Sequence, residues 1–153
     1  MYPISFQDKA KNILAGWAIC VLVVFIVCKI FDIFYFGYNT PDFSFVIAEQ
    51  PKLYQKIFQA CIFAPLWEEA LFRHFPFQIL KVFPHREKLL WPVILGTSFI
   101  FGYMHGHSYN VGIQGLVGVV FAHVYIRNGY SYWSSVALHS LYNLTLTIGL
   151  VNL

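Results

Sequence analysis

Long apolar segments, separated by short polar connections, make up most of this sequence. The segments span residues 12–36, 52–83, 89–104, 111–126 and 132–153. A helix needs about 20 residues to cross the ~30 Å hydrocarbon core of a membrane, and these segments reach or approach that length. The alternating pattern of a β-strand is absent, so helices must satisfy the backbone hydrogen bonds. The sequence therefore predicts an all-α polytopic membrane protein with about five transmembrane helices.

The composition excludes several classes of protein. Only 11% of the 153 residues are charged, 58% are hydrophobic, and the mean hydropathy is +0.60. Because an average soluble domain is about 25% charged, a soluble enzyme and a disordered chain are both disfavoured. The net charge of +3 comes with no basic run or stripe, so no nucleic-acid partner is expected. The three cysteines lie in apolar segments, which favours free thiols over disulfides.

The basic residues predict how the chain is oriented in the membrane. With five spans, one side of the membrane receives Lys9, Lys11, Lys81, Arg86, Lys88 and Arg127. The other side receives Lys52 and Lys56. Six basic residues against two favour a cytoplasmic N-terminus and a C-terminus outside. No small-residue cleavage pattern follows the first apolar segment, so we expect a retained helix and a single integral membrane domain over residues 1–153.

Ionisable and polar residues interrupt the apolar segments at helical spacing. They are Glu68, Glu69, Arg73, His105, His139 and Asn143. An ionisable group in a span costs roughly 2.5–3.5 kcal/mol at mid-helix. Glu69 and Arg73 are four residues apart and share a helix face, whereas Glu68 is turned about 100° away and can point into a site.

These polar residues are predicted to reach one level in the membrane. At a rise of 1.5 Å per residue, Glu68 lies roughly 20 Å from the cytoplasmic edge, His105 roughly 25 Å and His139 at most roughly 18 Å. Helix tilt can absorb such a spread. Taken singly, each group also has a structural interpretation: an ordinary ion pair, an interfacial histidine or interhelical hydrogen bonding. Three groups at compatible depth favour an active site between the helices.

Local signals predict where the helices end, bend and pack. Asn128-Gly129 is typical of a helix end, and Ser131 is suited to cap the segment that follows. Pro65, three residues before Glu68, should distort the helix beside the site. Close helix packing is predicted for a stripe of small residues, Gly115, Gly118 and Ala122.

Three short motifs carry a resemblance to a known family. The run from Glu68 to Arg73 matches EExxxR, Phe101 to His105 matches FxxxH, and His139 to Asn143 matches HxxxN. In this order and in membrane helices, they resemble the CAAX protease and bacteriocin-processing (CPBP, or Abi) family of intramembrane endopeptidases. The resemblance covers roughly residues 58–150. It implies a CPBP-like catalytic core over residues 52–153, with residues 12–36 as an accessory first helix.

The resemblance implies a role for each motif residue. Glu68 would be the general base that activates a water molecule, and His105 would help to hold and polarise that water. His139 and Asn143 would donate hydrogen bonds to the developing oxyanion. The supporting pair would be Glu69 and Arg73.

The same resemblance bears on cofactors, substrates and location. It implies no cofactor, because Asn143 is a poor zinc ligand and a good oxyanion donor. The alternative is zinc bound by Glu68, His105 and His139, with an open fourth position. The expected partners are the lipid bilayer and a membrane-anchored protein or peptide substrate, in a prokaryotic cell (inner) membrane. The short chain leaves a prenylated protein, a sorting tail, a leader peptide and a bacteriocin precursor open as substrates.

Two other functions compete with proteolysis. A non-catalytic immunity or adaptor membrane protein of the same fold is disfavoured because an inactive site does not need Glu68. A proton or ion carrier would also bury glutamate and histidine. Carriers, however, usually show inverted repeats and broken helices in both halves of the chain, and neither pattern is found here.

Overall fold

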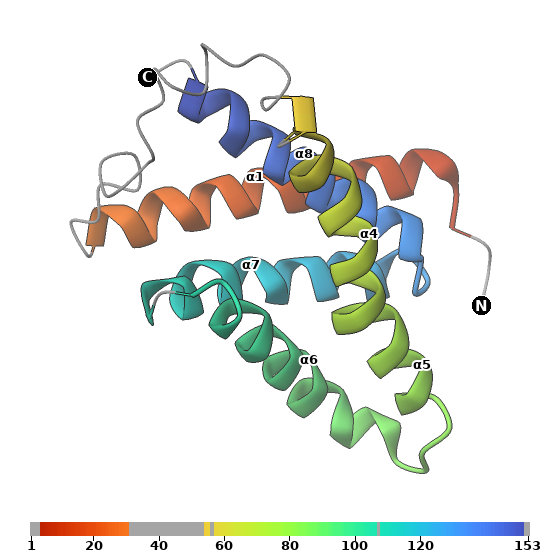
Figure 1. The fold of residues 1–153 in the computed structure, drawn as a ribbon. Coiled ribbons are helices and arrows are strands. Elements are labelled where there is room, and N and C mark those ends of the chain that lie inside the picture. The colour runs from red at the N-terminus through yellow and green to blue at the C-terminus, as the bar shows by residue number, and fades with distance from the viewer. Residues whose placement is uncertain (1–3, 31–53, 56, 107, 152–153) are drawn as a thin grey trace.

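The computed structural model describes residues 4–30, 54–55, 57–106 and 108–151, and within them the chain is helical, without strands. The elements in Figure 1 are α1 (Phe6–Ile30), η1 (Gln59–Phe63), α4 (Ala64–Glu69), η2 (Ala70–His74), α5 (Phe75–Leu80), α6 (Arg86–Tyr103), α7 (Ser108–Arg127) and α8 (Tyr132–Val151). The predicted all-α class is confirmed for these residues. The connection predicted after the first segment and both ends of the chain lie outside the described residues.

Elements η1, α4, η2 and α5 follow one another without a break and form one helical segment, here called the second segment. It contains two π-helical stretches, and each leads directly to a proline. The amide of Ala64, just before Pro65, bonds to the carbonyl of Gln59, five residues back. The same five-residue step precedes Pro76. Proline has no N–H and its ring clashes with the carbonyl four residues back, so a widened turn accommodates it. The distortion predicted at Pro65 is thus a π-helical turn just before the proline.

Helices α6 and α7 approach each other closely at glycines. A Cβ placed on Gly102 would lie 2.8 Å from the backbone nitrogen of Gly115 and 2.9 Å from the carbonyl oxygen of Asn110. At such distances a side chain at residue 102 would have to push the two backbones apart. All three small residues of the predicted stripe are buried, so the predicted close packing is confirmed.

Replacing Gly102 by alanine is therefore expected to destabilise the fold by about 1–3 kcal/mol or more, because α7 must move away from α6. Gly96→Ala is the matched control: it lies on the same helix, and nothing lies within 4 Å of its Cβ position. The control should gain about 0.5–1 kcal/mol from helix propensity. Thermal unfolding of the purified variants in detergent measures both effects. Equal melting temperatures for the two variants would contradict this packing.

Helix α1 is part of the common core, since it packs against α7 and α8 (Figure 1). Cys20 is fully buried there, and Cys20, Cys28 and Cys61 are thiols outside any disulfide, as predicted. Two polar contacts fix the helix in place. The indole nitrogen of Trp17 donates to Thr145 Oγ1 at 2.9 Å, and Asn12 Nδ2 donates to Asn128 Oδ1 at 2.7 Å. The first helix therefore supports α8, which carries His139.

The turn between α7 and α8 is built as the sequence predicts. Gly129 has a φ of +73°, the left-handed conformation that commonly ends a helix. The hydroxyl oxygen of Ser131 then accepts a hydrogen bond from the amide of Ser134 at 3.4 Å, the geometry of an N-cap. The predicted end of α7 and start of α8 are thus confirmed.

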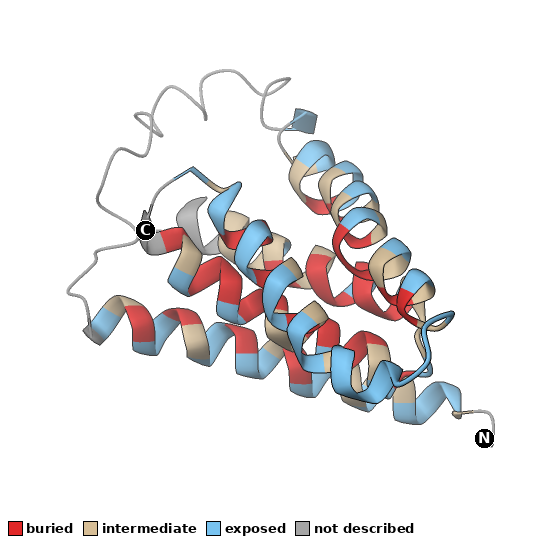
Figure 2. Ribbon diagram, turned by 90° about the horizontal axis from the view of Figure 1, so that it is seen from below, coloured by how far each residue is buried: buried red, intermediate tan, exposed pale blue. Residues whose placement is uncertain are grey.

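Large apolar side chains are exposed on every helical segment. Examples are Phe25 on α1, Trp67 on α4, Phe99 on α6, Leu116 on α7 and Trp133 on α8. Figure 2 shows that exposed positions line the outer faces of the helices and buried positions the inner faces. Among the described helices, one stretch, Phe6–Lys29, is long and apolar enough to cross a membrane. The arrangement with five spans stays a prediction.

Candidate active site

The predicted pair of Glu69 and Arg73 lies at the junction of α4 and η2, and both side chains are fully buried. Arg73 Nη1 donates to Glu69 Oε1 at 3.1 Å, and Nη2 donates to the carbonyl of Gly118 on α7 at 3.2 Å. A buried guanidinium is tolerated only when its charge and its N–H groups find partners. The predicted ion pair is confirmed, and it also joins the second segment to α7.

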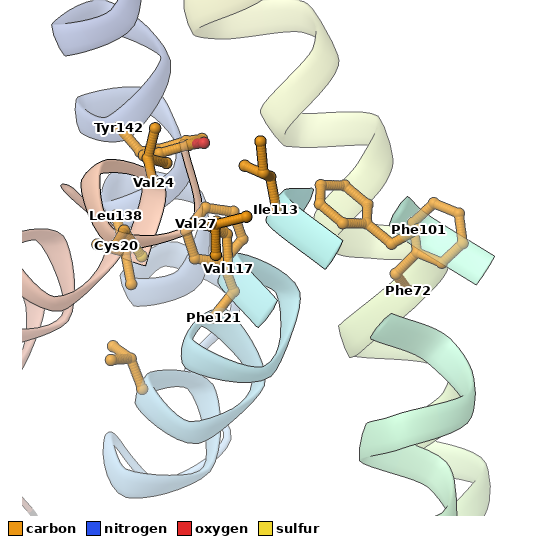
Figure 3. Close-up of a cluster of buried hydrophobic side chains, with 11 residues drawn as sticks. Cys20, Val24, Val27, Phe72, Phe101, Ile113, Val117, Phe121, Leu138 and Tyr142 are labelled. Atoms are coloured by element: carbon orange, nitrogen blue, oxygen red, sulfur yellow. The ribbon is translucent and has the colours of Figure 1, made fainter. Parts of the chain in front are cut away.

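Aromatic rings surround the guanidinium of Arg73. Its central carbon lies 4.4 Å from the ring centre of Phe101 and 5.4 Å from that of Phe121, within cation–π range. Figure 3 shows Phe101 beside Phe72, and Phe121 belongs to the same cluster of buried side chains. A Cβ on Gly118 would lie only 2.8 Å from Arg73 Nη2. Gly118 therefore makes room for the guanidinium as well as for α6.

His139 on α8 lies between the two adjacent glutamates and is almost fully buried. Its Nδ1 is 2.9 Å from Glu69 Oε1, and its Nε2 is 3.6 Å from Glu68 Oε2. Glu69, ionised beside Arg73, can only accept a hydrogen bond, so Nδ1 carries a proton. In the neutral ring, Nε2 then presents its lone pair toward Glu68. Arg73, Glu69, His139 and Glu68 thus form one continuous series of contacts, here called the buried polar chain.

The two neighbouring glutamates have different surroundings, as their angular separation predicts. The side chain of Glu69 is 0% exposed, whereas that of Glu68 is 23% exposed. Glu68 Oε2 is itself buried and has no hydrogen-bond partner among the described residues. It is the oxygen that faces His139. Among the described residues, Glu68 is therefore the member of the buried polar chain whose side chain is partly exposed and whose inner oxygen accepts no hydrogen bond.

Ser135 also contacts the buried polar chain, and sequence analysis did not select it. Its hydroxyl, fully buried, donates to Glu69 Oε2. Ser135 lies four residues before His139 and so faces the same way on α8. That spacing was a usable signal, but serine is so common in helices that only the contact with Glu69 distinguishes it.

His105 follows the end of α6 and is half-buried. Its Nδ1 is 2.7 Å from the carbonyl oxygen of Phe101, so Nδ1 donates and Nε2 is left as an acceptor in the neutral ring. The ring of Phe101 lies 4.7 Å from that of His105 and 5.7 Å from that of His139, centre to centre. Phe101 thus contacts both imidazoles, which places His105 and His139 in the same region of the molecule.

Asn143 stands one turn beyond His139 and anchors α8 to the second segment. Its Nδ2 donates to the carbonyl of Ala60 in η1 at 2.7 Å. In a π-helix the carbonyl of Ala60 would accept a hydrogen bond from the amide five residues ahead. That residue is Pro65, which has no N–H. Asn143 supplies the missing donor with one of its two N–H bonds. The motif residue thus has a structural contact that the sequence did not predict.

Metal ligation was the alternative use of this site. Among the residues that the structure describes, no group of three or more histidine, cysteine, aspartate or glutamate side chains is arranged to hold a metal ion. Glu68, His105 and His139 therefore do not form a ready three-ligand cluster of the kind that catalytic zinc uses.

The helical fold and the buried polar chain define a protein with a glutamate–histidine site enclosed by helices. A family model, described as type II CAAX prenyl endopeptidase Rce1-like, matches residues 50–145. The match covers most of the chain and includes all six residues selected from the sequence motifs. The chain belongs to this Rce1-like family of type II CAAX prenyl endopeptidases, which confirms the predicted family. Comparisons with curated proteins and with solved structures gave no match.

Proposed function

We propose that this protein is an intramembrane endopeptidase in which Glu68 activates the water that attacks a peptide bond. One observation carries the proposal. Glu68 Oε2 is buried, has no hydrogen-bond partner within the described part of the chain and faces the imidazole of His139, whose Nδ1 contacts the ionised Glu69. A carboxylate with a free acceptor and an adjacent ring nitrogen is suited to accept a proton and pass it on. Membership of an endopeptidase family supports this use of the geometry.

The proposed reaction uses the buried polar chain as a proton store. Glu68 removes a proton from water while the water oxygen bonds to the peptide carbonyl carbon, whose oxygen gains the electron pair. Glu68 passes the proton to His139 Nε2, which lies 3.6 Å from Glu68 Oε2. The imidazole ring is then a cation between the carboxylates of Glu68 and Glu69. Collapse of the tetrahedral intermediate breaks the carbon–nitrogen bond, and the stored proton goes to the leaving nitrogen. Arg73 balances the charge of Glu69 throughout.

His105 and Asn143 complete the proposed site. With Nδ1 bound to the carbonyl of Phe101, His105 has Nε2 as an acceptor for the attacking water. Asn143 gives one N–H to the carbonyl of Ala60, and its second N–H would donate to the oxyanion. The charged His139 ring would donate to the same oxyanion through Nε2. These roles need no cofactor, and we propose none.

We further propose that the protein is integral to a prokaryotic cell (inner) membrane, with its N-terminus in the cytoplasm and its C-terminus outside. Apolar side chains exposed on all the described helical segments support a lipid environment. The substrate would be a protein or peptide that is itself anchored in the bilayer. A substrate held in the membrane needs no extra-membrane domain to bring it to the site.

Cleavage of a membrane-anchored substrate tests the proposal directly. We expect purified protein in liposomes to cut members of a lipid-embedded peptide library, and we expect cleavage to survive EDTA and o-phenanthroline. The reason is that the glutamate–histidine contacts activate water without a Lewis acid. Mass spectrometry of the products measures both the cleavage and its position.

Three results would contradict parts of this proposal. Cleavage that chelators abolish and zinc restores would make Glu68, His105 and His139 metal ligands. An immunity or adaptor protein would be favoured if no anchored class were cleaved. The classes to test are prenylated proteins, sorting tails, leader peptides and bacteriocin precursors. Proton flux through liposomes without any cleavage would favour a carrier.

A further inference from the structure

We infer that Ser135 is a positioning residue of this active site, which orients His139 by holding the second oxygen of Glu69. The inference rests on the proposed function and deepens it. Ser135 lies outside the three sequence motifs, but its fully buried hydroxyl reaches the centre of the buried polar chain. The argument follows from how the two oxygens of Glu69 are divided among their donors.

The carboxylate of Glu69 is held from two helical segments. Its Oε1 accepts from Arg73 Nη1 at 3.1 Å and lies 2.9 Å from His139 Nδ1. Its Oε2 accepts from Ser135. Ser135 and His139 are one turn apart on α8, so both oxygens of Glu69 are held by this helix: Oε2 by Ser135 and Oε1 by His139. The carboxylate therefore cannot rotate without breaking a contact to α8.

Ser135 also prevents a competing arrangement. A guanidinium and a carboxylate prefer a fork with two parallel N–H···O bonds. Here Arg73 gives Glu69 only Nη1, because Nη2 donates to Gly118. Without the serine hydroxyl, Glu69 Oε2 would lose its donor and could turn toward Nη2 to complete that fork, which would draw the carboxylate away from His139.

The orientation of His139 depends on that carboxylate. While Glu69 Oε1 faces Nδ1, the proton stays on Nδ1 and Nε2 faces Glu68. A carboxylate behind a histidine fixes both its tautomer and its ring plane. A Glu69 side chain drawn toward Arg73 would release both, and Nε2 would no longer be held toward Glu68. Ser135 therefore acts through Glu69 and needs no contact with the substrate.

Replacing Ser135 by alanine is expected to lower kcat about tenfold or more and to leave KM within about twofold. The reason is that the variant loses the hydrogen bond to Glu69, which orients His139, and loses no contact with the substrate. The matched control is Ser134→Ala. Ser134 is also buried on α8, but its hydroxyl donates to Ser131 in the helix cap. The control should keep the wild-type kcat. Rates are compared per folded protein, so a loss of stability alone does not count.

A spectroscopic measurement tests the inference apart from cleavage. In an NMR spectrum of ¹⁵N-histidine-labelled protein in detergent, the signal of His139 should be that of the Nδ1–H tautomer. The signal is assigned to His139 because it is lost in His139→Gln. Ser135→Ala should shift it toward a mixture of tautomers, whereas Ser134→Ala should not. An unchanged His139 signal in Ser135→Ala would overturn the inference even if the protein cleaves peptides. A changed signal in a protein that cleaves nothing would keep the positioning role and overturn the proposed function.

Discussion

Replacing Glu68 by glutamine is expected to abolish peptide cleavage while the protein still inserts and folds. The amide has the size of the carboxylate but cannot accept a proton from water, and the loss of a general base typically costs 10²–10⁴-fold in rate. Folding should tolerate the change because Glu68 is partly exposed and its Oε2 has no hydrogen-bond partner among the described residues. The rate of cleavage in liposomes and the melting temperature in detergent measure the two parts of this prediction.

Glu87→Gln is the control for the loss of one negative charge. Glu87 is an exposed glutamate in the first turn of α6 and belongs to none of the three motifs. Its variant should cleave at the wild-type rate. Cleavage by Glu68→Gln at a comparable rate would remove Glu68 from the role of base. In that case Glu69 could not take its place without leaving Arg73 unpaired in the core.

Much of the site was predictable because helical spacing decides which residues share a face. Glu69 and Arg73 pair as their four-residue separation indicates, and Glu68 faces a different environment, as the 100° step requires. The family followed from the same motifs and is confirmed by the match over residues 50–145. These features are local, so the sequence is sufficient to find them.

The features that sequence analysis missed depend on contacts between helices. Ser135 and the carbonyl of Gly118 contact the buried pair from α8 and α7, and no local pattern places them there. The bond from Asn143 to Ala60 was also unforeseen. It exists because a π-turn before Pro65 leaves a carbonyl without its usual donor. Proline predicted a distortion in this helix, but only the fold shows which side chain compensates for it.

The first helix shows a different limit of sequence reasoning. It lies outside the family match, and the motif pattern makes it an accessory element. In the structure its Cys20, Val24 and Val27 belong to the same buried cluster as Phe101 and Phe121 (Figure 3). These two rings lie against Arg73 and His139. The residues that bring α1 to the site are ordinary apolar ones, so composition alone does not distinguish them from the exposed apolar residues of the same helix.

Replacing Arg73 by alanine is expected to lower the yield of folded protein as well as activity. The variant leaves Glu69 buried with an uncompensated charge, and breaking a buried ion pair typically costs about 3–5 kcal/mol. That loss is a large part of the roughly 5–15 kcal/mol by which a typical protein is stable. The substitution also empties the space beside the rings of Phe101 and Phe121, against which the guanidinium packs. Folded yield after detergent extraction and the melting temperature measure the effect.

Two further variants separate the charge from the packing. Arg86→Ala removes an exposed arginine at the start of α6 and should leave both yield and activity unchanged. The double variant Glu69→Gln with Arg73→Met removes both charges and keeps much of the volume, so it should recover folded yield relative to Arg73→Ala. It should not recover cleavage, because a neutral Glu69→Gln side chain no longer stabilises a charged His139. If Arg73→Ala instead gave normal yield with lost turnover, Arg73 would act directly on the substrate rather than through Glu69.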